Sequence, residues 1–360
     1  MAPPLDMATL ALHADDGIEP GPDVAPALHP TTTFVADNTQ GLVYSRNDNP
    51  TRARLEAVLG ALEGGHAAVY GSGLAAVTAL LHHLHPKRVA IEGGYHGTHA
   101  VLAQWEALGV ESIPFNADLR QGDLLWLETP KNPMCEVADI AESARRAHVA
   151  RAWIAVDSTF ATPVLQQPLA LGADFVMHSS TKFLSGHSDA LGGVLAVVDP
   201  ERAKRLRQER SVQGSVLGVL ETWLTLRSLR TLSLRVKRQS DTATQLAQWL
   251  SQKVAKTWHP SLPGHPGYQV AREQMRGPGG VLSIELDSEH QARSLPGMLR
   301  LFEDATSLGG VESLIEWRRR HDPKAPVGLL RVSAGLEEAN DLIQDLRQGL
   351  IAVGHKLNGG

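Results

Sequence analysis

The sequence is poor in the features that mark secreted, metal-rich and membrane proteins. It has a single cysteine, Cys135, in 360 residues, which excludes an intrachain disulfide framework and a cysteine-rich zinc site. It has no run of about 18 apolar residues, the length that a transmembrane helix needs, and its first residues lack a signal-peptide pattern. The net charge of −5 argues against a nucleic-acid partner. We therefore expect a cytoplasmic protein with no metal site and no membrane or nucleic-acid partner.

The length and the changes in pattern along the chain predict three regions. A chain of 360 residues is long enough to bury a full core, and two domains are expected. Residues 1–45 are rich in Pro, Thr and Asp with little periodicity, and we expect an extended arm. Residues 46–235 are expected to form the larger domain, and residues 236–360 a smaller α+β domain.

The larger domain shows an alternation of strand and helix patterns. Short apolar runs predict strands at 67–70, 88–92, 112–115, 124–128, 153–157, 174–178 and 193–198. Helices are predicted at 52–62, 74–83, 98–108, 139–148, 201–209 and 217–229, with a short turn near 165–171. This order is typical of a mostly parallel sheet with helices on both faces.

The rest of the chain alternates differently. A long helix is predicted at 232–254, followed by a strand at 281–287, a helix at 290–301, a strand at 329–334 and a helix at 338–353. In open α/β sheets, ligands bind outside the carboxyl ends of the strands. The residues that follow each strand of the larger domain are therefore the first candidates for a site.

Three of these strand ends carry chemically informative residues. Gly71-Ser72-Gly73-Leu74 opens a helix, an arrangement that binds phosphate or serves only close packing. Lys182 follows Ser179 and Thr181, and it is either a nucleophilic amine at a cofactor or a surface lysine in a polar loop. Asp157 ends an apolar strand, where it either pairs with a cation such as a protonated pyridine or caps a helix.

Together these sites resemble the fold-type I pyridoxal phosphate (PLP) enzymes, and more closely the Cys/Met-metabolism (trans-sulfuration) family of the cystathionine γ-synthase and γ-lyase type. The resemblance runs over nearly the whole chain. It is carried by the segments 9–14, 30–34, 44–46, 49–52, 71–73, 128–133, 156–163, 178–187, 307–313 and 330–337. It implies an aspartate aminotransferase-like α/β fold with a large PLP-binding domain and a small C-terminal domain.

The resemblance also implies a role for each matching residue. Lys182 would form the aldimine link to PLP and shuttle protons at Cα and Cβ, and Asp157 would pair with the pyridine N–H. Tyr95 would stack on the ring and assist proton transfer. The phosphate would be held by Ser72, Gly73, Leu74, Ser179 and Thr181.

Further implied roles concern the substrate and a neighbouring subunit. Arg331 would clamp the substrate α-carboxylate as a bidentate donor, with Asn132 and the backbone at Ser307 completing that site. Tyr44 and Arg46 would reach the phosphate of a neighbouring subunit. The implied partners are a small amino-acid substrate and a second copy of the chain, in a homodimer or a homotetramer built as a dimer of dimers.

Without the resemblance, simpler interpretations hold for several of these residues. Tyr95 would be a partly buried strand-end tyrosine, and Arg331 an edge or interface charge in a strand. His178 and His187 are interpreted as structural. The run of arginines at 318–320 is more often a solvated face than a binding patch.

The sequence departs from the family pattern where the far end of the substrate is recognised. Ala100 stands where these enzymes usually carry an arginine, and Thr306 stands where they often carry a glutamate. Gly97 replaces the cysteine of methionine γ-lyases, and the segment 316–323 replaces the usual histidine- and methionine-bearing loop. One hypothesis is that the arginines 318–320 supply the missing distal charge.

The resemblance predicts γ-elimination or γ-replacement on cystathionine or an activated homoserine. Elimination would give a lyase, and capture by a thiol would give a synthase. The alternatives are an O-acylhomoserine sulfhydrylase, a C–S β-lyase, and a catalytically silent PLP-fold binding protein.

Overall fold

The structure is a computed structural model that describes residues 5–18 and 22–357. The chain forms two compact units, each considered by itself below. The first unit comprises the residues up to 128 together with 139–233, and the second comprises 129–138 and the residues from 234 onward. The short segment 129–138 therefore belongs to the second unit, although both of its flanks belong to the first.

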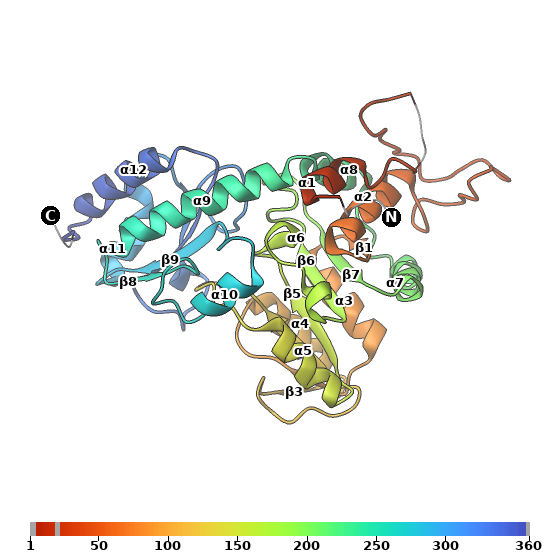
Figure 1. Cartoon of the computed structure of the whole chain (residues 1–360), viewed down its shortest axis with the longest axis horizontal. Helices are drawn as coiled ribbons and strands as arrows, with labels where there is room; N and C mark the ends of the chain where they lie inside the picture. Colours follow the sequence, from red (N-terminus) through yellow and green to blue (C-terminus); the bar gives the residue numbers. More distant parts are fainter. Residues whose placement is uncertain (1–4, 19–21, 358–360) are drawn as a thin grey trace. The chain divides into compact units, whose positions relative to one another are not determined.

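The first unit is built on a seven-stranded sheet (Figure 1), with strand order β1-β7-β6-β5-β4-β2-β3. All pairs are parallel except those that β7 makes with β1 and β6. The strands are β1 (His66–Tyr70), β2 (Arg88–Ala90), β3 (Glu111–Ile113), β4 (Leu124–Glu128), β5 (Trp153–Asp157), β6 (Phe175–Ser179) and β7 (Gly193–Val197). The predicted mostly parallel α/β sheet is confirmed.

Helices cover both faces of this sheet. They are α1 (Met7–His13), α2 (Pro50–Glu63), α3 (Gly73–Leu84), α4 (His96–Glu106), α5 (Ile140–Val149), α6 (Thr162–Leu165), η1 (Pro168–Leu171), α7 (Pro200–Gln213) and α8 (Val219–Leu229). Side chains of α3, α4 and α7 share one buried cluster with Met177 of β6. The next residue, His178, contacts Glu63 of α2, and because side chains alternate along a strand, α2 covers the opposite face.

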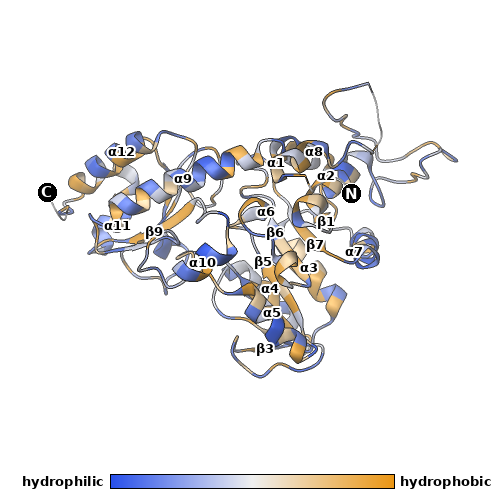
Figure 2. Cartoon of the chain, viewed as in Figure 1, coloured by the Kyte–Doolittle hydropathy of each residue, from blue (hydrophilic) through white to orange (hydrophobic). Residues whose placement is uncertain are grey.

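The apolar strands of this unit stand out in Figure 2, whereas α7 is mostly hydrophilic. Strands covered on both faces are expected to be apolar throughout, and β7 is buried at all five positions. Helix α7 buries only Ala203, Leu206 and Arg210 and presents its other side chains outward. The hydropathy of each element therefore follows from how many of its faces are covered.

The second unit contains a five-stranded sheet in the order β10-β11-β12-β9-β8. Its strands are β8 (Lys256–Trp258), β9 (Val281–Glu285), β10 (Glu303–Asp304), β11 (Leu314–Trp317) and β12 (Leu329–Ser333). Only β10 and β11 pair in parallel. The helices are α9 (Leu232–Leu250), α10 (Tyr268–Gln274), α11 (Glu289–Ser294), η2 (Pro296–Met298), η3 (Arg318–Arg320) and α12 (Ala339–Ala352).

The core of the second unit lies between this sheet and two long helices. Helix α9 contributes residues 243, 246, 247 and 250, the spacing of a single helical face. Helix α12 contributes Leu342, Leu346 and Leu350, which are all fully buried. Among the described residues, no helix is long and apolar enough to cross a membrane.

Two of the predicted elements differ from the structure. The arm is not extended throughout, because Asp6 caps a helix at Met7–His13 with a 3.0 Å bond from Ala8 N to its Oδ1; residues 1–4 and 19–21 of the predicted arm lie outside the described residues. The helix predicted at 290–301 ends at Ser294, and Pro296, which has no N–H to donate, starts a separate short turn.

Candidate functional site

Asp157 is the last residue of β5 and is buried. Its Oδ1 accepts two hydrogen bonds from Thr159, one from the backbone N at 3.0 Å and one from Oγ1 at 2.5 Å. Thr159 Oγ1 in turn accepts from Ser179 N at 2.9 Å. This chain of contacts fixes the Asp157 carboxylate between the ends of two adjacent parallel strands.

The environment of Asp157 disfavours its charged form. Burial raises the pKa of this carboxyl above its usual range, and the two bonds from Thr159 and the charge of His178 oppose the rise. Neutral donors offset only part of the cost of burying a carboxylate. A cation bound at this carboxylate would favour its ionised form.

The N-terminus of α3 lies against the end of β6. Ser72 caps α3, its Oγ accepting from Ala75 N at 3.0 Å. A Cβ on Gly73 would lie 3.0 Å from Ser179 Cβ. A side chain at Gly193 would lie 2.1 Å from Ser72 O. The structure thus brings together Ser72, Gly73, Leu74 and Ser179 at a helix N-terminus, an arrangement that favours anions.

Lys182 lies in the turn that follows β6 and is half-buried. The turn is held by backbone bonds from Lys182 N to Ser179 O at 3.2 Å and from Gly186 N to Lys182 O at 2.8 Å. The Oγ1 of Thr181 accepts from Gly192 N at 3.1 Å and also bonds Gly192 O at 3.3 Å. These contacts attach the loop to Gly192, the residue before β7, and this loop carries Lys182, the predicted nucleophile.

Tyr95 caps the start of α4 and is 40% exposed. Its backbone N donates to Glu128 Oε2 at 2.7 Å, which fixes the turn at the end of β4. A Cβ on Gly97 would lie 2.4 Å from Tyr95 Cε1 and 3.1 Å from Leu74 Cδ2. The tyrosine ring therefore rests on Gly97 beside Leu74 at the start of α3, and any side chain at 97 would displace it.

The residues of the first unit fit PLP on three counts. A buried carboxylate supported by neutral donors, Asp157, would accept the ring N–H. A capped helix N-terminus with a close backbone approach at Gly73 would receive the phosphate. A half-buried amine, Lys182, lies on the loop that follows β6, and Ser179 at the end of β6 lies against Gly73. These features are the chemistry that the cofactor requires of a protein.

In the second unit, Arg331 lies with the two residues predicted to act beside it. Its Nη1 donates to Asn132 Oδ1 at 3.1 Å, and its Nη2 donates to Ser307 O at 2.9 Å. Ser307 has φ +82°, a left-handed conformation that is unfavourable for a residue with a Cβ. The bond from Arg331 to its carbonyl helps to hold this conformation.

Two structurally important residues were not singled out from the sequence. Thr159 is the residue that holds the Asp157 carboxylate. Glu316 is buried opposite Arg331 and accepts from its Nη2 at 2.6 Å. The signal for Glu316 was present, because an acid in the apolar segment 314–317 has to be paired with a cation.

Tyr44 and Arg46 lie together in the single chain, and Arg46 contacts the end of α7. The Arg46 guanidinium lies 5.7 Å from the Tyr44 ring centroid, and its Nη1 donates to Ser211 O at 2.9 Å. Beside them, Asn47 Oδ1 accepts from Ser211 Oγ at 2.8 Å. These contacts attach the end of the arm to the last turn of α7.

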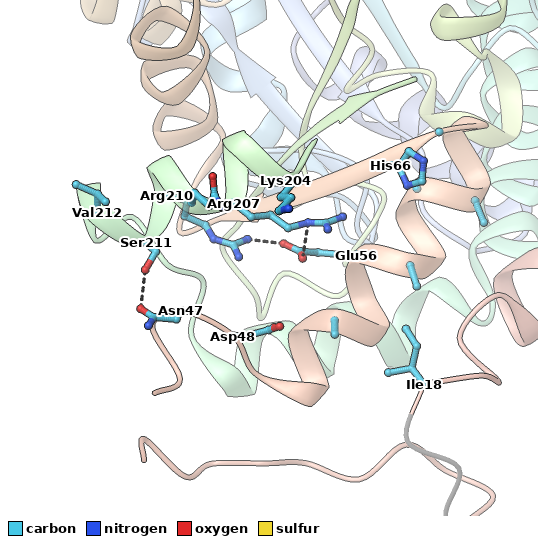
Figure 3. Close-up of a pocket in the computed structure, with 16 residues that line it drawn as sticks. Ile18, Asn47, Asp48, Glu56, His66, Lys204, Arg207, Arg210, Ser211 and Val212 are labelled. Atoms are coloured by element: carbon cyan, nitrogen blue, oxygen red, sulfur yellow. Dashed lines mark hydrogen bonds and ion pairs between the residues drawn. The ribbon is translucent and has the colours of Figure 1, made fainter. Parts of the chain in front are cut away.

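A cavity of about 890 Å³ lies at this attachment, and Figure 3 shows the residues that line it. In it, Glu56 of α2 bonds both Arg207 and Arg210 of α7. The remaining acidic and basic side chains of the lining are those of Asp48, Lys204 and His66. None of the predicted site residues lines this cavity, so it is separate from the PLP residues named above.

Comparison with other proteins gives consistent matches. The family model described as Cys/Met metabolism PLP-dependent enzyme matches residues 8–351. The chain is 39% identical to a cystathionine gamma-synthase of Mycobacterium tuberculosis, covering 95% of this chain and 96% of the relative. It is 40% identical to a putative cystathionine gamma-lyase of Streptomyces coelicolor, covering 92% and 88%. The crystal structure of metB from Corynebacterium glutamicum superposes with a TM-score of 0.92 at 33% identity, covering 97% and 98%.

Proposed function

Since the chain belongs to the Cys/Met metabolism family of PLP-dependent enzymes, we propose that it catalyses γ-elimination or γ-replacement on cystathionine or an activated homoserine. The observation that carries this proposal is the identity of 39–40%, over more than nine-tenths of the chain, to relatives named for γ-synthase and γ-lyase activity. The presence of every predicted cofactor residue in the first unit supports it.

The proposed role of Lys182 is proton transfer. When bound, PLP supplies an electron-withdrawing ring that stabilises negative charge on substrate carbons. The Lys182 amine removes the proton from Cα and later the proton from Cβ, after which the γ-substituent leaves. Asp157 keeps the pyridine nitrogen protonated, which maintains the electron demand of the ring.

The remaining proposed cofactor contacts follow from the geometry at the start of α3. The phosphate is bound by the helix N-terminus at Ser72, Gly73 and Leu74, with the hydroxyls of Ser179 and Thr181. Tyr95 would stack on the ring, and Gly97 leaves space for the tyrosine side chain there. Each group binds or orients the cofactor, so its loss should weaken cofactor affinity before it alters the reaction.

The substrate carboxylate is assigned to Arg331, Asn132 and the backbone at Ser307. An arginine with fixed orientation suits a planar carboxylate. Ala100 in the first unit and Thr306 in the second are both exposed and uncharged, so neither offers a counter-charge for a charged γ-substituent. For this reason the sulfhydrylase and the β-lyase remain the second candidates.

We also propose self-association, as a homodimer or a dimer of dimers. The support is the arm, where Val35 and Val43 are 82% and 69% exposed in the single chain. Exposed apolar residues on an extended segment are typical of an interaction surface. A second subunit would cover them and would receive Tyr44 and Arg46 at its phosphate. The buried single cysteine is consistent with the proposed cytoplasmic location.

The proposal is tested by a substrate panel on the purified, cofactor-loaded protein. Cystathionine, O-succinylhomoserine and O-acetylhomoserine are offered with and without a thiol, and 2-oxo acid, ammonia, thiol and thioether products are quantified. Release of 2-oxobutanoate and ammonia identifies γ-elimination, thioether formation identifies replacement, and pyruvate identifies the β-lyase alternative. Absence of all products would contradict the proposal.

Lys182→Ala is the matching variant, and Lys87→Ala, at an exposed lysine of the same unit, is its control. Lys182→Ala should abolish turnover and shift the visible absorbance of bound PLP, because the covalent link and the proton-transfer group are both lost. Lys87→Ala should change neither. Normal turnover in Lys182→Ala would refute the assigned nucleophile, and a wild type without PLP absorbance would favour the catalytically silent alternative.

A further inference from the structure

Glu316 is placed beside Arg331 by the sheet register of the second unit. In the antiparallel pair of β11 and β12, Glu316 lies directly opposite Arg331, and residues opposite each other share one face of the sheet. Arg331 Nη2 donates to Glu316 Oε2 at 2.6 Å. Arg318, two residues after Glu316, donates from its Nη1 to the same Oε2, also at 2.6 Å. One carboxylate oxygen thus bridges two guanidinium groups.

All three side chains are removed from water. The exposed fractions are 1% for Glu316, 5% for Arg331 and 9% for Arg318. In such surroundings charges are screened little, so the sum of the charges matters. Two arginines and one glutamate leave a net charge of +1, whereas Arg331 with Glu316 alone would be neutral. His321 Nε2, 3.7 Å from Glu316 Oε1, is half exposed and lies at the edge of the group.

The other two arginines of the run are occupied differently. Arg320 forms a bidentate pair with Asp304, with both distances 2.8 Å, and Arg319 lies 3.6 Å from Glu289. Both pairs are partly exposed, so water screens them. Only Arg318 contacts the carboxylate that holds Arg331. The three consecutive arginines, which look equivalent in the sequence, therefore have different partners in the structure.

We propose that Glu316 and Arg318 are positioning residues for the carboxylate clamp of Arg331: Glu316 orients its guanidinium, and Arg318 offsets the charge of Glu316, so that the buried group keeps one positive charge for an incoming α-carboxylate. This inference rests on the proposed role of Arg331 in substrate binding. Within segment 316–323, Glu316 and Arg318 would therefore act on the substrate carboxylate through Arg331.

The experiment compares two probes on the full-length, PLP-loaded protein. L-methionine carries an α-carboxylate, and 3-(methylthio)propylamine is the same molecule without it. The concentration that half-saturates the change in cofactor absorbance is measured for each probe. The variants are Arg318→Met, Glu316→Gln and the double variant, and Arg320→Met is the matched control.

The charge count predicts an ordered set of results. Arg318→Met makes the group neutral and should weaken L-methionine binding about tenfold or more, with little change for the amine. The double variant restores the net charge of +1 and should recover much of that loss. Glu316→Gln alone should bind L-methionine at least as well as wild type, and Arg320→Met should match wild type.

Several outcomes would overturn the proposal. They are unchanged L-methionine binding in Arg318→Met, equal weakening of both probes, or no recovery in the double variant. If Arg318→Met fails to fold, weaker L-methionine binding in Glu316→Gln refutes the charge count. If wild type responds to neither probe, the proposed function fails. The positioning roles of Glu316 and Arg318 are then tested by measuring the affinity of the same variants for L-methionine by calorimetry.

Discussion

The two units each bury a charge that the proposed reaction needs, and they support it in opposite ways. Asp157 in the first unit is held by a neutral residue, Thr159, and its pKa is raised by burial. Arg331 in the second unit is paired with Glu316, which is itself paired with Arg318. The Asp157 carboxylate is thus hydrogen-bonded by neutral donors, whereas the Arg331 guanidinium is paired with a charged group of the protein itself. The first unit thus leaves the charge of Asp157 for the cofactor to balance, whereas the second unit pairs Arg331 internally and keeps a net charge of +1 for the substrate carboxylate.

The strongest test of this contrast removes Arg331. Arg331→Leu leaves Glu316 with one arginine partner, Arg318, instead of two, and the loss of one buried hydrogen bond to a charged group should lower the unfolding free energy by about 2 kcal/mol. L-methionine binding should weaken about 100-fold, because the carboxylate loses its main donor. Denaturant unfolding and absorbance titration measure the two effects. A variant as stable as wild type would mean that the pairing contributes little to the second unit.

Asp157→Asn should have the opposite effect on stability. Affinity for PLP should fall about 100-fold with loss of the charged partner, while the cofactor-free protein should be no less stable than wild type. In wild type without PLP, the raised pKa means that stability decreases as pH rises from the unfolded value of about 3.9 through the folded pKa. The asparagine variant lacks this decrease, so the stability difference should grow with pH.

Thermal unfolding of both proteins, with and without PLP, checks this prediction. A cofactor-free Asp157→Asn protein that melts well below wild type at neutral pH would show that the charge is already compensated. The contrast with Arg331 would then disappear.

His259 shows how the second unit treats a buried group that is hydrogen-bonded to neutral partners. Its Nε2 bonds Gly279 O at 3.1 Å and its Nδ1 bonds Ser261 Oγ at 2.7 Å, and burial lowers its pKa to about 4. The pKa of His259 is lower in the folded protein than in the unfolded chain. Its contribution to the unfolding free energy is therefore complete above pH 6.5 and is lost as the pH falls toward the folded pKa. Between pH 7 and pH 5 the loss should be about 2 kcal/mol.

The measurement is the unfolding free energy of wild type and His259→Gln across that pH range. The variant, which cannot gain the proton, should show a flatter pH profile than wild type. Parallel profiles would assign the acid sensitivity to other groups.

The smallest effect is expected at the surface pair of Arg320 and Asp304, each 37% exposed. Arg320→Ala should change the unfolding free energy by about 0.5 kcal/mol, because water screens such pairs. High salt should reduce even this difference. An effect as large as that of Arg331→Leu would show that exposure does not decide how much an arginine of this unit contributes to stability.

Much of the first unit follows from local pattern. The seven predicted strands are all present, with ends shifted by no more than two residues, because buried parallel strands are short apolar runs bounded by polar turns. The missed helices and strands are short: α1 in the first unit and β8, α10, β10 and β11 in the second. The formation of the missed strands depends on neighbours distant in sequence, such as the pairing of residues 314–317 with 330–333.

The sequence by itself determined the family, the cofactor and the strand ends that carry Asp157 and Lys182. These follow from short motifs, each of which is complete within one continuous segment of the chain. Only the tertiary structure decided which groups hold those residues. Thr159 holds Asp157 through a turn, Gly97 admits the Tyr95 ring, and Glu316 meets Arg331 across a strand pair. Hydrogen bonds and ion pairs act over a few ångströms in space, so a residue's role as a partner becomes visible only when the fold brings the two groups together.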